Sequence, residues 1–297
     1  MAPTTDADPK APDAPILITG LPRCGSSWVG QCVARLPNVR YRYESFNADW
    51  VPALKGKLAP LQYQPPGTEG PPRIRYAADR AFAGRQSAKQ YLRGLYRGYA
   101  APTIRRRGTL VLKDPTACLL AGWLAERENC RIVVLTRHPC GFVHSVRLLG
   151  WPMPLERLLR QKRLLRDHLS SHSDCLVASL SDPLAALGAL WAATHLVLKR
   201  QSETTASPWS FVSYEQLCLE PENGFLRLSE ALGLTVKAPE PAATHRDDPG
   251  STRKDGMRVA NAWREALTEQ EIQRVMAPVR TLGLEAMVEM APDQPGP

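Results

Sequence analysis

A glycine-rich turn near the N-terminus has the residue types and spacing of a phosphate-binding loop. The segment 20–27 reads GLPRCGSS, follows an apolar run at 15–19 and precedes a stretch of helical periodicity at 26–35. Glycines allow backbone N–H groups to approach an anion closely, and the N-terminus of the following helix favours negative charge. The sequence therefore predicts an anion-binding site at this turn.

The turn departs from the nucleoside-triphosphatase pattern at Ser26, where that pattern has a Lys for the β- and γ-phosphates. Arg23 instead places a cation inside the turn. ATP or GTP hydrolysis is therefore disfavoured. A small-metabolite kinase remains an alternative, although it would need a metal-binding carboxylate after an apolar strand, where Thr136 and Arg137 stand. A nucleotide-binding protein without catalysis is a second alternative.

A second group of polar residues follows the apolar run 131–136. Arg137 comes directly after this run, and Ser145 lies within the helical segment expected at 141–149. An Arg at a strand end can pair with a phosphate group, and a Ser hydroxyl on the next helix can donate a further hydrogen bond. The sequence therefore predicts a second anion-binding element at this strand-to-helix junction.

Together these two elements resemble the sulfotransferase family that uses 3′-phosphoadenosine-5′-phosphosulfate (PAPS), and most closely its carbohydrate and bacterial branches. In that family the first turn binds the 5′-phosphosulfate and the second element binds the 3′-phosphate. A late loop, Arg253-Lys254-Asp-Gly256, resembles the family segment that closes over the 3′-phosphate. The resemblance assigns donor binding to Pro22, Arg23, Cys24, Gly25, Ser26, Ser27, Trp28, Arg137, Ser145, Arg253, Lys254 and Gly256.

The resemblance implies transfer of the PAPS sulfonate to a hydroxyl, or less often an amine, of a small-molecule or glycosylated acceptor, leaving the nucleotide product PAP. Such transfer needs a base and positive charge around the transferring group. Glu44 follows the strand expected at 39–43 and matches the position of the base in carbohydrate-type members. The cytosolic branch uses a His after its third strand, but residues 112–116 contain none. No metal is required, and the sequence shows no metal-ligand cluster.

Three further charged residues complete the predicted catalytic set. Lys113 is expected to steady the sulfonate or the bridging oxygen, and Arg23 to supply charge from the turn. Asp114 is expected either to orient the reacting group or to act as an alternative base.

Five other side chains have a purely structural interpretation that competes with a functional one. Trp28 either contacts the adenine or packs its helix, with packing favoured, and Trp151 is a candidate for lining the acceptor pocket. Packing is also favoured over reactivity for Cys24 and Cys140. His138 is expected to be a loop residue rather than a base.

The elements that position these residues alternate along the chain. Short apolar runs at 15–19, 109–113, 131–136 and 209–214 predict strands, a further strand is plausible at 39–43, and helical segments separate them. This alternation predicts one α/β domain with a mainly parallel central sheet flanked by helices, as in phosphate-binding-loop proteins.

The domain is expected to span residues 15–290, between a flexible leader at 1–14 and a flexible tail at 291–297. Residues 47–84, rich in Pro and Gly and without regular periodicity, and residues 150–180 are expected to shape the acceptor site or a lid.

Composition limits the partners of the chain. Its formal net charge of +9 suits anionic ligands, but the Arg residues are scattered and no nucleic-acid motif appears. The N-terminus lacks a signal-peptide pattern, and no apolar run approaches the roughly 18 residues of a membrane helix. The seven cysteines include no CxxC pair and indicate reduced thiols. A cytoplasmic enzyme without nucleic-acid or membrane partners is therefore expected, and a homodimer is left open.

Overall fold

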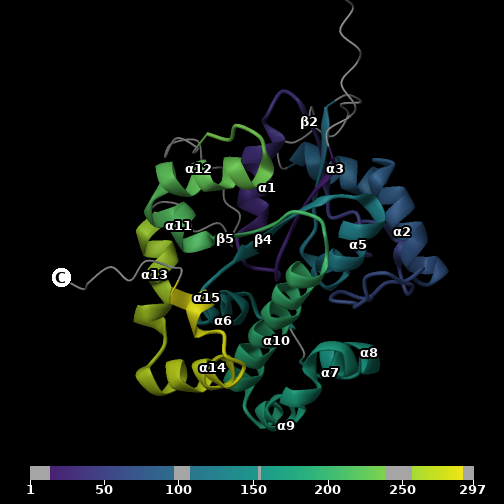
Figure 1. Ribbon diagram of the computed structural model, residues 1–297. Coiled ribbons are helices and arrows are strands. Elements are labelled where there is room, and N and C mark those ends of the chain that lie inside the picture. Colours follow the sequence, from purple (N-terminus) through teal and green to yellow (C-terminus); the bar gives the residue numbers. More distant parts are fainter. Residues whose placement is uncertain (1–13, 97–107, 153–154, 238–255, 290–297) are drawn as a thin grey trace, which may run out of the picture.

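A parallel sheet forms the centre of the computed structural model, which describes residues 14–96, 108–152, 155–237 and 256–289 (Figure 1). The five strands pair in the order β2-β3-β1-β4-β5, and every pair is parallel. This confirms the α/β class and the parallel sheet predicted from the sequence. The strands are β1 (Ile16–Thr19), β2 (Val39–Tyr43), β3 (Thr109–Lys113), β4 (Arg131–Thr136) and β5 (Trp209–Ser213).

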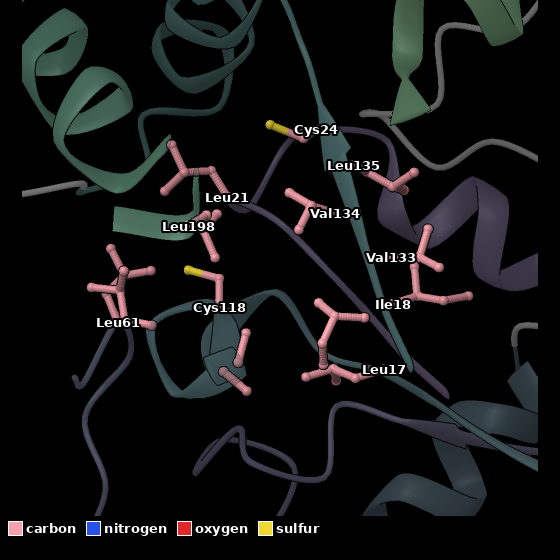
Figure 2. Packing of buried hydrophobic residues seen from close by; sticks show 14 of the residues in the cluster. Leu17, Ile18, Leu21, Cys24, Leu61, Cys118, Val133, Val134, Leu135 and Leu198 are labelled. Carbon is pink, nitrogen blue, oxygen red and sulfur yellow. The ribbon is translucent and has the colours of Figure 1, made fainter. Parts of the chain in front are cut away.

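The central strands are apolar along most of their length because helices cover both faces of the sheet. Every residue of β1 and β3 is buried. Side chains of β1 and β4 pack in one cluster with Leu198 and Cys118, as Figure 2 shows from close by. The edge strand β2 reads VRYRY, and Arg42, which is only 6% exposed, donates from Nε to the carbonyl of Gly84 at 2.8 Å. The free edge of β2 is therefore partly covered by the segment that ends at Gly84.

Helices surround the sheet, with α1 and α12 above the strands and α6 and α10 below them in the view of Figure 1. The long helix α10 packs against α5, α6 and α14. None of the described helices combines the length and the hydropathy that a membrane span needs. The α-helices are α1 (Ser26–Ala34), α2 (Pro72–Phe82), α3 (Ala88–Tyr96), α5 (Ala121–Glu128), α6 (Pro139–Leu149), α7 (Leu155–Leu159), α8 (Lys162–Leu164), α9 (Ser173–Ala178), α10 (Pro183–Thr204), α11 (Tyr214–Leu219), α12 (Pro221–Leu232), α13 (Gly256–Ala266), α14 (Glu269–Thr281) and α15 (Glu285–Glu289).

Shorter turns of helix complete the chain between these elements. They are the 3₁₀ helices η1 (Pro52–Leu54), η2 (Pro115–Leu120), η4 (Ser170–His172) and η5 (Ser179–Ser181), and the π-helix η3 (Leu165–Leu169).

The expectation that residues 47–84 lack regular structure is wrong for their last third, which forms α2. Pro72 stands in the first turn of this helix, where its missing N–H costs nothing. The helix buries Ile74, Ala77, Ala78 and Ala81, a spacing that follows one helical face. Flanking prolines and glycines hid this short apolar stripe in the sequence. Residues 150–180, which the sequence left without assigned elements, include α7, α8, η3, η4 and α9.

A glycine at the end of β1 lets the chain turn close to the neighbouring strand. Gly20 has φ +127°, and a Cβ added there would lie 2.3 Å from the carbonyl oxygen of Leu135. Gly150 also has positive φ, at +61°, but a Cβ added there would meet no atom within 4 Å. A side chain at Gly20 would therefore cause both a steric collision and backbone strain, whereas a side chain at Gly150 would cause backbone strain alone.

We expect Gly20→Ala to lower the free energy of unfolding by about 2–4 kcal/mol, because it adds a backbone collision to the strain. Gly150→Ala should cost only about 1 kcal/mol, since strain alone acts there. Urea unfolding of both variants measures the difference. Equal losses would contradict the tight approach of Gly20 to β4.

Candidate active site

The turn from β1 to α1 has the backbone shape of an anion cradle. Gly25 caps α1 with φ +85°, and a Cβ added there would lie 2.3 Å from the ring of Tyr214. Arg23 also has positive φ, at 78°, which is unusual for a residue with a side chain. Such strain persists where surrounding contacts enforce it, as at binding sites. The loop therefore presents its backbone and the N-terminus of α1 toward the carboxyl edge of the sheet.

The two predicted halves of the donor site contact each other directly. Arg23 donates from Nε to Oγ of Ser145 at 3.0 Å, and Arg137 donates from Nη1 to the carbonyl of Arg23 at 3.0 Å. The guanidinium of Arg23 also lies 5.4 Å from the ring centroid of Trp151. Residues more than 100 positions apart in the sequence are thus brought together at the ends of β1 and β4.

Arg137 is held in place on several sides and keeps one donor available. Its carbonyl accepts a hydrogen bond from the indole of Trp191 at 2.8 Å, and its guanidinium lies 4.7 Å from the ring centroid of Tyr214. Its Nε is buried and has no hydrogen-bond partner. Buried donors in proteins are nearly always paired, so an orphaned one at a predicted phosphate site fits an anionic ligand such as the 3′-phosphate of PAPS.

The sequence analysis gave no role to Tyr214 and Glu215, which follow β5 at this edge. Glu215 accepts from the backbone N–H of His138 at 3.0 Å and from the hydroxyl of Ser213 at 3.2 Å. Burial raises the pKa of Glu215, while the N–H of His138 and the charge of Arg137 oppose the shift. A carboxyl directly after a strand at the carboxyl edge was the signal that could have identified it.

Other predicted donor-site residues lie in or beside the turn. Trp28 meets Tyr214 and Phe225 edge to face at centroid distances of 6.0 and 5.4 Å, which fits packing. Cys24 and Cys140 are fully buried, and burial raises the pKa of each thiol to about 12, so neither has thiolate character. Ser26 is buried, and Pro22, Gly25 and Ser27 are partly exposed along the turn.

The late basic loop is only partly placed. Arg253 and Lys254 lie outside the described residues, and Gly256 begins α13. Farther along α13, the ring of Trp263 stacks on His138 with centroids 4.2 Å apart and planes 9° apart. His138 itself accepts from the N–H of Cys140 through Nδ1 at 3.1 Å and caps α6, so the structure places it as a loop residue at the helix start. α13 is thereby fixed next to Arg137.

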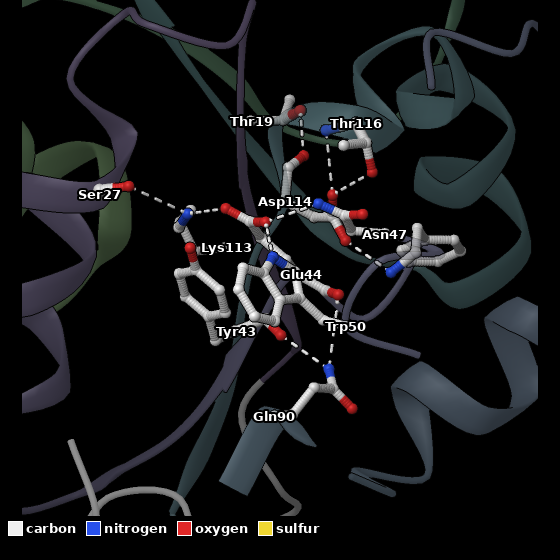
Figure 3. Close-up of polar contacts among 11 residues, drawn as sticks. Thr19, Ser27, Tyr43, Glu44, Asn47, Trp50, Gln90, Lys113, Asp114 and Thr116 are labelled. Atoms are coloured by element: carbon white, nitrogen blue, oxygen red, sulfur yellow. Dashed lines mark hydrogen bonds and ion pairs between the residues drawn. The ribbon is translucent and has the colours of Figure 1, made fainter. Parts of the chain in front are cut away.

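The predicted base lies at the end of the edge strand and forms a buried ion pair. Glu44 Oε1 lies 2.6 Å from Nζ of Lys113, whose side chain is fully buried, and the same Nζ donates to Oγ of Ser27 at 3.4 Å. Figure 3 shows this row from Ser27 through Lys113 to Glu44. Lys113 therefore connects the donor turn to the predicted base. Gly30 of α1 makes room chiefly for Tyr41, since a Cβ there would lie 2.3 Å from the hydroxyl of Tyr41 and 3.3 Å from Cγ of Lys113.

The other carboxylate oxygen of Glu44 faces away from the donor turn. Oε2 accepts from the amide of Asn47 and from the indole N–H of Trp50, both at 2.8 Å. Burial alone would raise the pKa of Glu44, but the charge and hydrogen bond of Lys113, with the other donors, hold it below the ordinary value. Glu44 is therefore an ionised carboxylate at neutral pH.

Asp114 is fully buried, and both of its carboxylate oxygens are occupied. Oδ2 accepts from the N–H of Phe46 at 2.6 Å, and Oδ1 accepts from the N–H and the hydroxyl of Thr116 at 3.0 and 2.6 Å. Burial, followed by the charge of Glu44, raises the pKa of Asp114 to about 6. That value would suit a base, but a base must also reach its substrate, and Asp114 has no exposed surface whereas Glu44 keeps 7% of its surface exposed. Asp114 instead links η2 to the turn after Glu44 through these hydrogen bonds.

The two segments expected to shape the acceptor site contact each other. Tyr63 shares a hydrogen bond of 2.9 Å between its hydroxyl and Nε2 of His168, which lies in η3. Gln161 accepts from the N–H of Tyr63 at 2.8 Å and donates to the carbonyl of Leu61 at 2.8 Å. A role of these segments in acceptor binding stays a prediction. Within the described part of the chain, no group of three or more His, Cys, Asp or Glu residues could hold a metal ion.

Comparisons with known proteins give a family and a set of distant structures. Residues 15–238 match the model of the Sulfotransferase family. No curated protein sequence matches the chain. The sulfotransferase domain of the Synechococcus PCC 7002 olefin synthase is 15% identical with a TM-score of 0.47, covering 95% of this chain and 98% of that one.

Two further solved structures are similarly distant. The sulfotransferase domain from the curacin biosynthetic pathway is 16% identical with a TM-score of 0.47, covering 92% of this chain and 99% of that one. A sulfotransferase from Alicyclobacillus acidocaldarius is 15% identical with a TM-score of 0.41, covering 91% and 96%. Because their sequence identities and TM-scores are low, the assignment to the family depends on the family model alone.

We expect Lys113→Met to lower the free energy of unfolding by about 3–5 kcal/mol at pH 7.5, because it leaves the carboxylate of Glu44 buried without its cation. In the unmodified protein the lowered pKa of Glu44 contributes stability above the ordinary Glu value, and this is lost as the pH falls through the folded value. In the variant, burial should instead raise the pKa of Glu44, so its deficit should shrink as the pH falls.

Urea unfolding at pH 7.5 and pH 5 tests this expectation. The double variant Glu44→Gln/Lys113→Met is the control, because without the carboxylate of Glu44 its deficit should change less with pH, and only through Asp114, whose pKa is about 6. A deficit of Lys113→Met that is the same at both pH values would show that Glu44 is not the group left unpaired.

Proposed function

The chain belongs to the sulfotransferase family, and we propose that it transfers the sulfonate group of PAPS to a hydroxyl of a small-molecule or glycosylated acceptor, with Glu44 as the general base. The observation that carries this proposal is the contact row Ser27–Lys113–Glu44, because it places an ionised carboxylate next to the donor turn through one shared cation. The family implies PAPS as the donor.

The residues present fit the two anionic ends of this donor. The turn 20–27 offers backbone N–H groups, the N-terminus of α1 and the cation of Arg23 for the 5′-phosphosulfate. Arg137, with its unpaired Nε, and Ser145 would hold the 3′-phosphate. When bound, PAPS supplies a sulfonate on a good leaving group, and the phosphate of PAP departs with the electron pair of the broken S–O bond.

Glu44 would take the proton of the attacking hydroxyl through a carboxylate oxygen. Its ion pair with Lys113 keeps it deprotonated at neutral pH, at the cost of some basicity. Once Glu44 is protonated, the ion pair weakens, and the ammonium of Lys113 becomes available for the charge that grows on the leaving oxygen. Asp114 would act through position, since it binds the backbone of Phe46 two residues beyond the base.

The donor site is tested first by binding of PAP. We expect Arg137→Ala to weaken PAP binding by about 10–100-fold, as the loss of a charge-assisted hydrogen bond predicts. Arg160→Ala, which removes an exposed Arg on another part of the surface, should leave binding unchanged. Isothermal titration calorimetry measures both. Absence of PAP binding to the unmodified protein would reject the proposed function.

The base is tested by separating donor binding from turnover. We expect Glu44→Gln to keep the PAP affinity and to lower kcat by about 10²–10⁴-fold, because Gln preserves the shape of the side chain but accepts no proton. The assay follows labelled sulfonate from PAPS across a panel of alcohols. Turnover that survives in Glu44→Gln would move the base to another residue while leaving the donor site intact.

A further inference from the structure

The sheet order places the acceptor on one particular side of Glu44. Moving across the carboxyl edge, β4 carries Arg137, β1 leads into the donor turn, β3 carries Lys113 and β2 carries Glu44. Donor contacts thus extend from β4 to β3, and Glu44 is the last group in the row. The acceptor must approach the base from the side that the donor does not occupy, which is the side of Oε2, Asn47 and Trp50.

The helix α3 docks directly onto this side. Gln90 donates to the carbonyl of Tyr43 at 2.7 Å, and Ser87 donates from Oγ to the carbonyl of Trp50 at 2.5 Å. Figure 3 shows Gln90 reaching the strand end beneath Trp50. Gln90 is fully buried, so α3 is anchored to the turn that holds the base rather than lying loosely over it.

Two cations of α3 lie over the ring of Trp50. Nζ of Lys89 is 5.2 Å and Cζ of Arg93 is 5.1 Å from the ring centroid. The guanidinium of Arg93 also lies 5.6 Å from the ring of Tyr96. Both cations are therefore oriented by an indole whose N–H is bonded to Glu44.

This pair of cations has no anion of its own within the described residues. Lys89 and Arg93 are one helical turn apart, a spacing at which like charges repel. Neither forms an ion pair with a described carboxylate, and Nε of Arg93 is buried without a hydrogen-bond partner. The nearby carboxylate of Glu44 is already engaged by Lys113. A negative group placed here would relieve the repulsion and satisfy the donors.

We propose that Lys89 and Arg93 bind an anionic group, a carboxylate or a sulfate ester, carried by the acceptor beside the hydroxyl that is sulfated. This inference rests on the proposed function, because it takes Glu44 as the base and the region beyond it as the acceptor side. Trp50 sets the spacing, since its indole N–H contacts the base and its ring supports the two cations. The acceptor class is then an acidic alcohol, such as a uronic acid or a partly sulfated sugar.

The test compares glycosides that differ in one charged group, with the donor site saturated by PAP. The probes are p-nitrophenyl β-D-glucuronide, its neutral counterpart p-nitrophenyl β-D-glucoside, and p-nitrophenyl N-acetyl-β-D-glucosaminide with and without a 6-sulfate. Calorimetry on the full chain should show at least about tenfold tighter binding of one charged member than of its neutral parent. Tighter binding of the glucuronide would identify a carboxylate as the preferred group, and tighter binding of the 6-sulfated glucosaminide would identify a sulfate ester.

The double variant Lys89→Met/Arg93→Met should abolish this preference, because Met keeps an apolar stem over Trp50 and removes both charges. Lys199→Met/Arg227→Met removes two exposed cations elsewhere and should retain it. All four proteins, including Glu44→Gln, should bind PAP equally. Equal or undetectable binding of charged and neutral glycosides, or a preference that survives in Lys89→Met/Arg93→Met, overturns the inference. Failure of PAP itself to bind would instead reject the proposed function.

Discussion

The buried ion pair between Lys113 and Glu44 is the interaction on which the arrangement of this site depends. A lysine with no exposed surface and a carboxylate with only a tenth of its side chain exposed are stable there because each satisfies the other. The pair joins the ends of β3 and β2, and through Ser27 it reaches the loop that follows β1. Three neighbouring strands therefore end in one connected set of polar groups, and none of the three charged or hydroxyl side chains can move far without unpairing another.

The surrounding backbone holds the polar groups of Ser27, Lys113 and Glu44 in position. Glu44 has positive φ, at 44°, and the turn that follows it is held by the carboxylate of Asp114. The backbone of Asp114 is in turn bonded to β1, since its carbonyl accepts from the hydroxyl of Thr19 at 2.8 Å. The same residue thus links donor strand, base turn and η2. Because the buried carboxylate of Asp114 needs hydrogen-bond donors on both oxygens, it stabilises one backbone geometry of the turn after Glu44.

Much of the fold and the donor half of the site follow from local sequence. The buried strands are mostly apolar and the edge strand β2 alternates Arg with Val and Tyr, so all five could be located, and the turn at Gly20 has the residues of a phosphate-binding loop. The contacts that complete the site depend on distant packing. The partnership of Glu44 with Trp50 needs α3 to dock on β2, and the fit of Gly25 against Tyr214 needs β5 to end beside α1. Neither of these two contacts can be predicted from the spacing of residues along the sequence. α2 was missed because the prolines and glycines that flank it mask a four-residue apolar stripe.

The position of β2 at the edge of the sheet has a consequence for how such a site can diverge. A central strand has neighbours on both sides, so any change at its end disturbs two others, whereas among the described strands β2 pairs with β3 alone. The chain between β2 and β3 supplies the partners of Glu44 that face away from the donor turn, and its described residues, 44–96 and 108, form no strand of the sheet. Substitutions and length changes in that segment can therefore alter the surroundings of Glu44 without disturbing a second strand of the sheet.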